Sequence, residues 1–552
     1  MLLYLQANFL ASKGCFFTEQ KYLLWVQFAG RQSKSARTII FAQKEYSMKE
    51  YDIVIIGTGA GLAILDIALQ KGMSCAIIER SKFGGTCLTR GCIPSKVLVH
   101  PADVIREAEH AQKTGLTFNL EKVDWQILSK RMWSQIDECK VIEENVGEVE
   151  GLDTYKGTGE FTGPYTMKVM LKDGSYSEEF KGQRFVIAAG GRTHIPSIKG
   201  LQETGFLDSE SFFGAGFPSK PWSSLVIIGG GAIGTEFAHI FSAFGTKVTI
   251  IDKNPCLVKK EEEEISELLA AQFRAVGIDV LLNSRVTKTS RTGDIKTVTV
   301  QDILTGETTS VDCDEIFVSS GIRSNADLLK VENSGIHTDA KGWIITNEYL
   351  QTSQKNIWAF GDINGKYQFR HKANYEAEIC AYNIFGQEQS RRAADYTKVP
   401  WAIFTFPQIA HVGLTEEEIK KLGIRYLVGK KYYSSVARGF AMGYLEGDAD
   451  DGFVKLLADE NMKILGAHIV GPQASVLIQP LVYLMNTGFT CKIESKKGFF
   501  GKAKEICTEG GTFVPMNQSM VIHPSLSEVV GWVTNTMTWA DAPSIDSEYP
   551  KL

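Results

Sequence analysis

The sequence lacks any run of 18 or more consecutive apolar residues, the length that a helix needs to cross a bilayer. We therefore predict no transmembrane helix and no membrane partner. Basic residues are not in excess either: 59 Lys and Arg stand against 64 Asp and Glu, a formal net charge of -5. The chain therefore has no excess of positive charge with which to bind the phosphates of a nucleic acid, so we predict no nucleic-acid partner.

Cysteine is sparse, with ten in 552 residues, which excludes the disulfide framework of a small secreted domain. A secretory signal with a charged start and a clean apolar core is also missing. We expect most of the cysteines to be buried thiols in a reducing, cytoplasmic compartment. Residues 1–47 are poor in acid and faintly basic, and we expect a leader or disordered extension there. The location would be mitochondrial if this segment is a transit peptide.

Two segments, residues 51–79 and 224–252, repeat one design of strand, glycine turn, helix, strand and terminal acid. Each has the length of the βαβ unit of a dinucleotide-binding fold. Their strands are continuous β-branched runs, which is typical of parallel strands buried on both faces. The pattern predicts an α/β protein with two doubly wound, Rossmann-like domains.

Short strands that end in glycine flank the second unit at residues 185–190 and 316–321, and a third such strand, residues 357–362, ends in Gly361 and Asp362. We infer that the second domain is inserted in the first. From about residue 399 strand-like and helical stretches mix, which indicates a separate α+β domain that includes a buried helix at residues 474–485. The boundaries that we predict are 1–47 for the leader, 48–200 and 325–398 for the first domain, 201–324 for the second and 399–552 for the third.

The second unit carries the pattern G-x-G-x-x-G with the expected flanks. Gly229 permits the tight turn, Gly231 lets a pyrophosphate approach, and Gly234 packs the helix on the strand. The pyrophosphate would lie on the helix N-terminus, where unpaired N–H groups favour an anion. Asp252 ends the next strand and can accept both ribose hydroxyls. Because its charge repels a 2′-phosphate, it favours NAD over NADP.

The first unit carries a related fingerprint, with Gly57, Gly59 and Gly61 in the turn and Glu79 as its acid. It departs from the pattern because the sixth position is Leu62 and the last glycine falls one place earlier. This departure predicts wider packing of the helix against its strand. The flanking strand, helix and acid still predict dinucleotide binding.

Residues 84–96 contain Cys87 and Cys92, five positions apart. Cysteines at this spacing do not share one face of a regular helix, so a bridge between them needs a bent segment, for which Gly91 supplies flexibility. Pro94 suits the first turn of a following helix, whose N-terminus would lower a nearby thiol pKa. A metal site and two inert thiols are the alternatives. No other Cys or His lies nearby at metal spacing, and we predict no metal site.

Residues 84–96 resemble the redox motif of the pyridine nucleotide-disulfide oxidoreductases, the group of glutathione reductase and dihydrolipoamide dehydrogenase. The resemblance runs from about residue 52 to residue 528. It implies FAD in the first domain, a nicotinamide cofactor in the second and dimerisation through the third. It also implies that Cys87 is the thiol that exchanges with substrate and that Cys92 lies against the flavin.

By the same resemblance Lys96 and Glu236 form an ion pair beside the flavin ring, and Asp362 holds the flavin ribitol. The strand-end glycines 190, 321 and 361 complete the cofactor sites. The full predicted set of cofactor-binding residues is Gly57, Gly59, Gly61, Glu79, Lys96, Gly190, Gly361 and Asp362 for FAD, and Gly229, Gly231, Gly234, Asp252 and Gly321 for NAD.

Residues 523–528 match the acid–base motif of the same group, with His523 and Glu528 as its members. Thiol–disulfide exchange needs a proton taken from one thiol and returned to another, and histidine titrates nearest neutrality. Glu528 can orient it, as an acid does in a catalytic triad. In the family the histidine reaches the partner subunit's site, so a homodimer is implied.

Three residues depart from the motifs, namely Thr89, Arg90 and Ser525. A lysine-rich segment, residues 489–510, also separates the apolar helix from His523. We expect this segment to be a solvated loop.

The predicted function is an FAD-dependent dithiol/disulfide oxidoreductase that passes electrons between NAD(H) and a dithiol such as dihydrolipoamide through Cys87 and Cys92. Dihydrolipoamide dehydrogenase is the leading hypothesis, and a 2-oxoacid dehydrogenase complex is then a candidate partner. A low-molecular-weight disulfide reductase of the mycothione or glutathione type is the runner-up. A non-catalytic flavoprotein scaffold is the alternative of another class.

Overall fold

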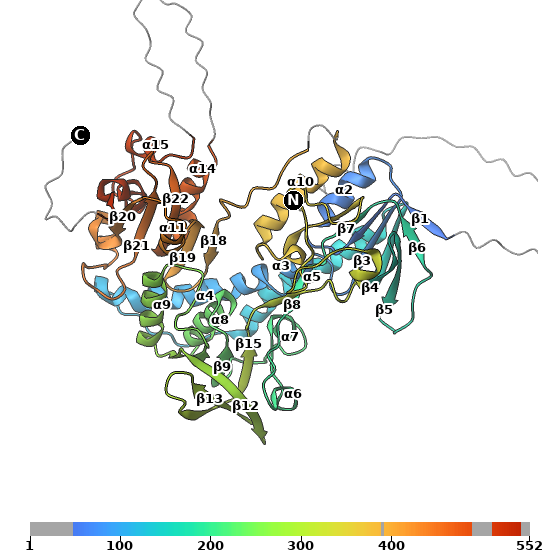
Figure 1. Ribbon diagram of the computed structural model, residues 1–552. Coiled ribbons are helices and arrows are strands. Elements are labelled where there is room, and N and C mark those ends of the chain that lie inside the picture. The colour runs from blue at the N-terminus through green and yellow to red at the C-terminus, as the bar shows by residue number, and fades with distance from the viewer. Residues whose placement is uncertain (1–47, 388–390, 488–509, 542–552) are drawn as a thin grey trace, which may run out of the picture. The chain divides into compact units, whose positions relative to one another are not determined.

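The computed structural model describes residues 48–387, 391–487 and 510–541 (Figure 1). The predictions for residues 1–47, and for all but the last residue of 489–510, therefore lie outside the described residues. Within the described ranges, no helix combines the length and the apolar character that a membrane crossing requires.

The first dinucleotide-binding domain is built on an eight-stranded sheet with strand order β1-β6-β5-β4-β3-β2-β7-β17. Its parallel centre consists of β3 (Cys75–Glu79), β2 (Ile53–Ile56), β7 (Phe185–Ile187) and β17 (Ile357–Ala359). Strand β17 pairs with β7 although the second domain lies between them in the sequence. This pairing confirms the predicted insertion. The remaining strands are β1 (Lys49–Tyr51), β4 (Leu152–Gly163), β5 (Thr166–Leu171) and β6 (Phe180–Gly182).

The second domain has a four-stranded parallel sheet with strand order β11-β10-β9-β15. Its strands are β9 (Ser224–Ile228), β10 (Lys247–Ile251), β11 (Asp279–Leu281) and β15 (Glu315–Val318), and its main helices are α8 (Ala232–Ala243) and α9 (Glu263–Ala275). An antiparallel sheet adds β12 (Ser284–Thr292), β13 (Ile295–Asp302) and β14 (Thr308–Cys313). The connections between the two domains pair as β8 (Gly191–Thr193) and β16 (Ile322–Ser324).

The third domain is a six-stranded antiparallel sheet with helices, as predicted. Its order β18-β19-β22-β21-β20-β23 joins β18 (Trp401–Ile403), β19 (Gln408–Gly413), β22 (Ile464–Gly471), β21 (Phe453–Ala458), β20 (Leu427–Tyr432) and β23 (Thr538–Trp539). Its helices are α11 (Glu416–Leu422), α12 (Ala437–Ala441), α13 (Ala474–Leu477), α14 (Gln479–Met485), α15 (Val514–Asn517) and α16 (Ser527–Gly531).

The single buried helix predicted at residues 474–485 is wrong in two respects. The segment forms two short helices, α13 and α14, and the side chains of Val476 and Tyr483 are each 66% exposed. Pro480 at the start of α14 removes a helix N–H donor, which accounts for the break.

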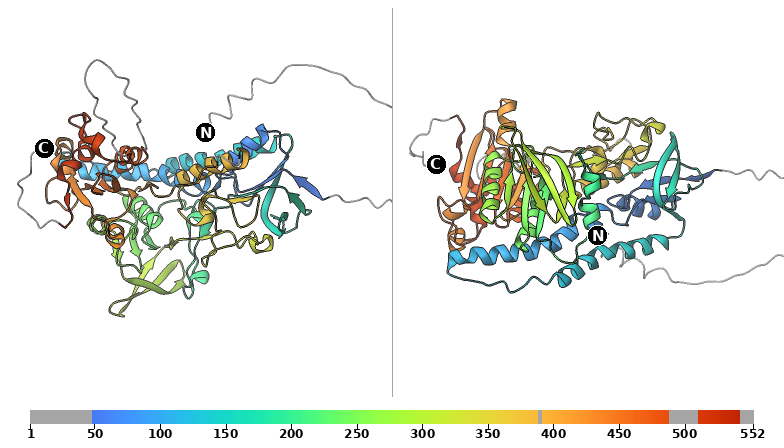
Figure 2. Two further views of the ribbon diagram at one scale, coloured as in Figure 1. Left: turned by 45° about the horizontal axis from the view of Figure 1, so that its top comes forward. Right: turned by 90° about the horizontal axis from the view of Figure 1, so that it is seen from below.

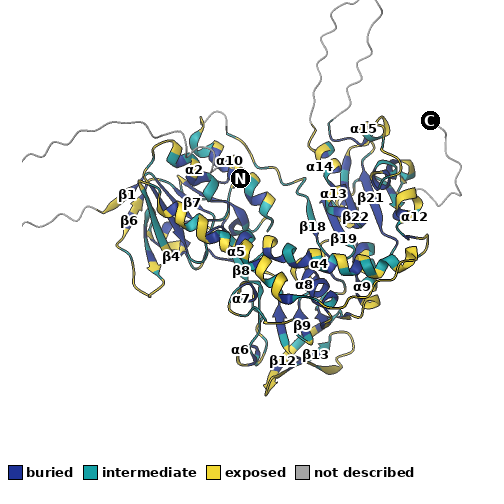
Figure 3. Ribbon diagram, turned by 180° about the vertical axis from the view of Figure 1, so that it is seen from behind, coloured by how far each residue is buried: buried dark blue, intermediate teal, exposed yellow. Residues whose placement is uncertain are grey.

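Two long helices connect the first domain to the second. Helix α4 (Cys92–His110) packs on one side against α5 (Trp125–Gly147) and on the other against α8 (Figure 2). The shorter helices are α2 (Leu62–Gln70), α3 (Gly85–Thr89), α6 (Leu201–Thr204), α7 (Ser209–Phe212) and α10 (Arg370–Phe385). Apolar residues of the central strands of each sheet are buried, as the dark ribbons of Figure 3 show. This core fixes the strand ends from which the site is built.

The glycine turns bring each helix against its strand. At Gly234 a Cβ atom would overlap the carbonyl oxygen of Gly229, and at Gly61 it would overlap that of Gly57. Gly61 thus makes the close approach one position earlier than the standard pattern. The prediction of wider packing is therefore wrong at this turn. By contrast, a Cβ at Gly231 would meet nothing within 4 Å.

These glycines provide a matched pair of substitutions. We expect Gly234→Ala to destabilise the second domain by about 2 kcal/mol, because the turn must shift to admit the methyl group. Gly231→Ala should leave the thermal unfolding midpoint of the nucleotide-free holoenzyme unchanged. It should weaken nucleotide binding, because its methyl group projects into the open turn. Equal unfolding midpoints for the two variants would contradict the assignment of Gly234 to close packing.

Candidate redox site

The predicted bend between the two cysteines is present. Helix α3 ends at Thr89, and α4 begins at Cys92 with Pro94 in its first turn. Gly91 precedes α4 with φ -147° and ψ -116°, and a Cβ there would press on the carbonyl oxygen of Thr86 at 3.0 Å. A side chain at this position would strain the bend, which brings two thiols from different helices together.

The two thiols interact directly. Both are free, and the hydrogen bond that Cys92 donates lowers the pKa of Cys87 to about 7, although burial opposes this shift. The positive charges of Arg370 and Lys96 lower the pKa of Cys87 further. The same bond, together with burial, raises the pKa of Cys92. A single thiolate is therefore stabilised at Cys87, where it is nucleophilic near neutral pH.

The ion pair of Lys96 and Glu236 lies beside the cysteines. Lys96 on α4 donates from Nζ to Glu236 Oε2 on α8 at 2.6 Å. The backbone N–H of Phe404, which follows β18, donates to Glu236 Oε1 at 3.0 Å. The Lys96 ammonium also lies 4.5 Å from the centre of the Phe404 ring. Residues of all three domains thus meet at one carboxylate.

Two cavities meet at the cysteine pair. The larger, about 1990 Å³, is lined by the Gly229–Gly231 turn, Asp252 and the ion pair, and the smaller by the Gly57–Ala60 turn and Glu79. Both are lined by Thr86, Cys87, Arg90, Cys92, Asp362, Gln368 and Arg370. A molecule in either cavity can therefore reach the thiols.

The smaller cavity has the donors and acceptors that FAD requires. Its turn opens on the N-terminus of α2, and a Cβ at Gly59 would have no atom nearer than 3.6 Å, which leaves space for a pyrophosphate. Glu79 is fixed at the end of β3 because its Oε2 accepts from the Thr58 N–H at 3.0 Å and hydroxyl at 2.6 Å. Asp362 also lines this cavity. Burial raises the pKa of Asp362 to about 6, although the positive charge of Lys372 acts to lower it.

The larger cavity fits a nicotinamide dinucleotide. The Gly231 turn opens on the N-terminus of α8, and Asp252 Oδ2 accepts from the Gly230 N–H at 2.6 Å. Asp252 Oδ1 accepts from the backbone and side chain of Asn254, both at 2.8 Å. Asp252 therefore also braces the turn, a role that the sequence did not predict. Four cations line the same end of the cavity: Lys253, Lys259, Lys260 and Arg285.

His523 and Glu528 pair, but this chain does not bring them to its own cysteines. His523 Nδ1 lies 2.6 Å from Glu528 Oε1, and the Ser525 N–H donates to Oε2 at 3.2 Å. Glu528 is fully buried, whereas the His523 side chain is 65% exposed and lines neither cavity. Exposed apolar side chains lie in the same domain, at Met520, Ile522, Val476 and Tyr483. His523 is therefore presented to solvent and lies outside both cavities of its own chain.

Comparison with known proteins decides the family. The family model "Pyridine nucleotide-disulphide oxidoreductase" matches residues 51–377, and the dimerisation-domain model of the same family matches residues 399–502. The chain belongs to this family. It is a flavoprotein disulfide oxidoreductase that uses a pyridine nucleotide, and it carries the family's dimerisation domain.

Similar proteins include enzymes that act on two different substrates. A mycothione reductase of Mycobacterium tuberculosis is 33% identical over 88% of this chain and 98% of its own length. A dihydrolipoyl dehydrogenase of Bacillus subtilis is 31% identical over 87% of this chain and 97% of its own. Among solved structures, the HOCl-induced flavoprotein disulfide reductase RclA from Escherichia coli, as a Cu(II) complex, gives a TM-score of 0.73 at 26% identity, over 89% of this chain and 99% of that one.

The contacts that support Asp362 in this oxidoreductase were not predicted from the sequence. Lys372 and Glu376 form a fully buried ion pair at 2.8 Å, one helical turn apart on α10. Lys372 donates to the carbonyl of Gly361 at 3.0 Å, and Glu376 accepts from the N–H of Gly361 at 2.7 Å. The sequence feature that could have predicted this ion pair is the spacing of two opposite charges four residues apart. Such a spacing more often marks the exposed face of a helix.

The assignment of the thiolate to Cys87 can be tested by alkylation. We expect iodoacetamide to label Cys87 of the reduced enzyme with a midpoint near pH 7. Cys92→Ala removes the hydrogen-bond donor and should raise that midpoint, because the thiolate loses its stabilising partner. Cys92→Ser keeps a donor hydroxyl and is the control, with a midpoint close to that of the wild type. Mass spectrometry of the labelled peptide over pH 5–10 gives the midpoints, and no rise in Cys92→Ala would disprove the assignment.

Proposed function

We propose that the protein is an NAD-linked dithiol oxidoreductase of the dihydrolipoyl dehydrogenase type, passing electrons between dihydrolipoamide and NAD(H). The observation that carries the proposal is the junction of the two dinucleotide cavities at Cys87 and Cys92. A dithiol that reduces this pair lies within reach of both cofactor sites. We assign the domains as predicted, with FAD on residues 48–200 and 325–398, NAD on 201–324 and the dimer contact on 399–552.

Substrate oxidation begins with Cys87 and Cys92 joined as a disulfide. His523, oriented by Glu528, accepts a proton from one substrate thiol, and the thiolate attacks Cys87 Sγ. The Cys87–Cys92 bond breaks and Cys92 leaves as a thiolate. The second substrate thiol attacks the substrate sulfur of the mixed disulfide, and Cys87 leaves and takes up the proton of that thiol. The substrate becomes a disulfide, and its two electrons remain on the cysteine pair.

The other residues of the site bind cofactors and stabilise charge. FAD, held by the Gly57 turn, Glu79 and Asp362, supplies the two-electron carrier between Cys92 and the nicotinamide. Lys96 holds positive charge beside Cys92, which favours its thiolate. Asp252 accepts the ribose hydroxyls and repels a 2′-phosphate, so we propose NAD as the coenzyme. Four cations at the same end of the cavity make NADP the competing coenzyme.

A second candidate function is reduction of a low-molecular-weight disulfide of the mycothione type. The 33% identity to a mycothione reductase over almost the full length of that enzyme favours it. The chemistry is the same in reverse, since electrons then leave Cys87 for a disulfide substrate. We further propose a reducing, cytoplasmic compartment, in which the free thiols of Cys87 and Cys92 would stay available for either reaction.

Substrate assays of the FAD holoenzyme distinguish these functions. We expect NAD⁺ reduction with dihydrolipoamide to exceed, by at least tenfold in kcat/KM, NADH oxidation with mycothione or glutathione disulfide, and NADH to be preferred over NADPH. Preference for mycothione disulfide would replace the first proposal by the second. Absence of turnover with every pair, in protein that retains FAD, would favour the scaffold alternative. The Cys87→Ser holoenzyme is the matched background control.

The trans role of His523 is tested with two inactive variants. His523→Gln should reduce turnover by about two to four orders of magnitude, the usual contribution of general acid–base catalysis. When Cys87→Ser and His523→Gln chains are refolded together, random pairing gives heterodimers with one intact site. Activity should then recover to roughly a quarter of the wild-type value, as expected for an isologous dimer. No recovery in a sample in which heterodimers are demonstrated would contradict the trans role.

A further inference from the structure

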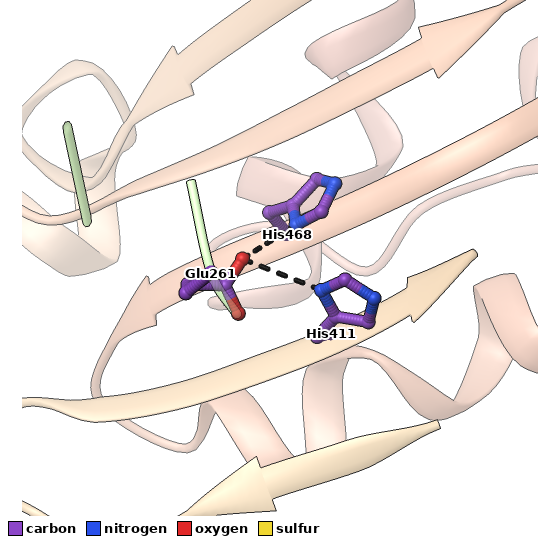
Figure 4. Close-up of side chains that lie close together, drawn as sticks. All are labelled: Glu261, His411 and His468. Atoms are coloured by element: carbon purple, nitrogen blue, oxygen red, sulfur yellow. Dashed lines mark hydrogen bonds and ion pairs between the residues drawn. The ribbon is translucent and has the colours of Figure 1, made fainter. Parts of the chain in front are cut away.

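A second cluster of titratable side chains lies away from the redox site. Glu261, just before α9, meets His411 of β19 and His468 of β22, and all three are buried (Figure 4). The two histidines are direct cross-strand partners. His468 Nδ1 lies 2.6 Å from Glu261 Oε1, and His411 Nδ1 lies 3.4 Å from the same oxygen. The second and third domains are therefore joined through this triad.

The outer nitrogen of each histidine ring is already committed. His411 Nε2 lies 2.9 Å from the carbonyl oxygen of Gly413, and His468 Nε2 lies 3.0 Å from that of Leu414. A carbonyl oxygen only accepts, so each Nε2 carries a proton. In a neutral ring the other nitrogen then has a lone pair, and both lone pairs face the Glu261 carboxylate. Three electron-pair donors directed at one point require a positive charge between them.

The carboxylate itself is incompletely satisfied. Glu261 Oε1 accepts from the Glu262 N–H at 3.0 Å as well as facing the histidines. Glu261 Oε2 is buried and has no hydrogen-bond partner among the described residues. Solvent cannot reach it either, because the side chain is fully buried. A buried carboxylate oxygen without a partner is costly, which indicates that a ligand of this group completes the site.

We propose that Glu261, His411 and His468 bind a divalent transition-metal ion of the zinc type. Two imidazole nitrogens and a carboxylate form a donor set that zinc prefers, and the three ligand atoms lie within 4.8 Å of one another. Glu261 Oε2 is free to supply a fourth coordination position. The Nε2–H to carbonyl bonds are the outer contacts that usually orient metal-binding histidines. Hard ions such as Mg²⁺ and Ca²⁺ are disfavoured by the two imidazoles.

The surroundings suit a structural ion. His411 is held by Trp401, whose ring stacks on it at 4.6 Å, and none of the three ligands lines either cavity. Neighbouring carboxylates are paired with lysines. Lys455 lies 2.8 Å from Glu262, 3.0 Å from Glu264 and 2.5 Å from Glu416. Lys430 also pairs with Glu264, and Lys420 with Glu416. Glu262 Oε1 also lies 3.5 Å from His468 Nε2. The ion would tie the second domain to the sheet of the third.

No metal site was predicted from the sequence. The ligands are separated by 150 and 207 positions in the chain, so no short spacing motif marks them. The competing occupant of the space between them is a pair of protons, which would turn both rings into imidazolium ions that donate to Glu261.

The experiment uses the oxidised FAD holoenzyme, in which the Cys87–Cys92 disulfide removes the competing thiols. After treatment with a chelator and dialysis against zinc chloride and then metal-free buffer, we expect about one zinc ion per chain. X-ray absorption at the zinc edge should show only N and O ligands at about 2.0–2.2 Å, without sulfur at about 2.3 Å. If the wild-type protein retains no zinc, or if the spectrum shows a sulfur ligand, the proposal is overturned, and no variant is needed for this conclusion.

Substitutions then locate the ion. Glu261→Gln and His411→Gln should each weaken zinc retention by at least tenfold. His239→Gln is the matched control, since His239 is also buried with a carboxylate at 2.8 Å, that of Asp103, but lies outside the triad. It should retain the wild-type zinc content. FAD content and unfolding midpoint identify misfolded variants. Equal zinc retention by all folded variants would overturn the assignment to this triad.

Discussion

The arrangement of the site depends on the ion pair between Lys96 and Glu236. Its two partners come from α4 and α8, and the second oxygen of Glu236 accepts the backbone N–H of Phe404. A buried carboxylate is stable only while both partners stay in place, so this contact holds residues of three domains together. Cys92 begins α4, four residues before Lys96, and Cys87 lies in the preceding helix α3, so the position of the cysteine pair relative to both cavities depends on the same contact.

Features encoded locally could be predicted from the sequence. The two βαβ units and the bend between Cys87 and Cys92 follow from β-branched runs and glycine positions within about thirty residues. The pairing of His523 with Glu528 was also predictable, because only five positions separate them. In each case the short stretch of chain between the residues leaves few ways to arrange them.

Contacts between distant segments could not be predicted. The run of four glutamates at residues 261–264 is typical of a solvated helix start, yet Glu261 and Glu262 are buried against the third domain. Lys455 sits in a strand whose six residues are all buried, where its charge is explained only by carboxylates from α11 and from the segment around the start of α9. The break between α13 and α14 was missed because apolar composition alone does not distinguish a continuous helix from two short ones.

The Lys455 cluster has a consequence for how the nucleotide enters. Burial disfavours the Lys455 charge, but three carboxylates outweigh this and raise its pKa, so the ammonium persists inside the interface. A hinge motion that moved α9 away from the sheet would separate Lys455 from Glu262 and Glu264 and leave it paired with Glu416 alone. These ion pairs therefore oppose a rotation of the second domain away from the third. The cavity wall that the second domain supplies is then ordered before the coenzyme arrives, so less conformational entropy is lost at each binding event.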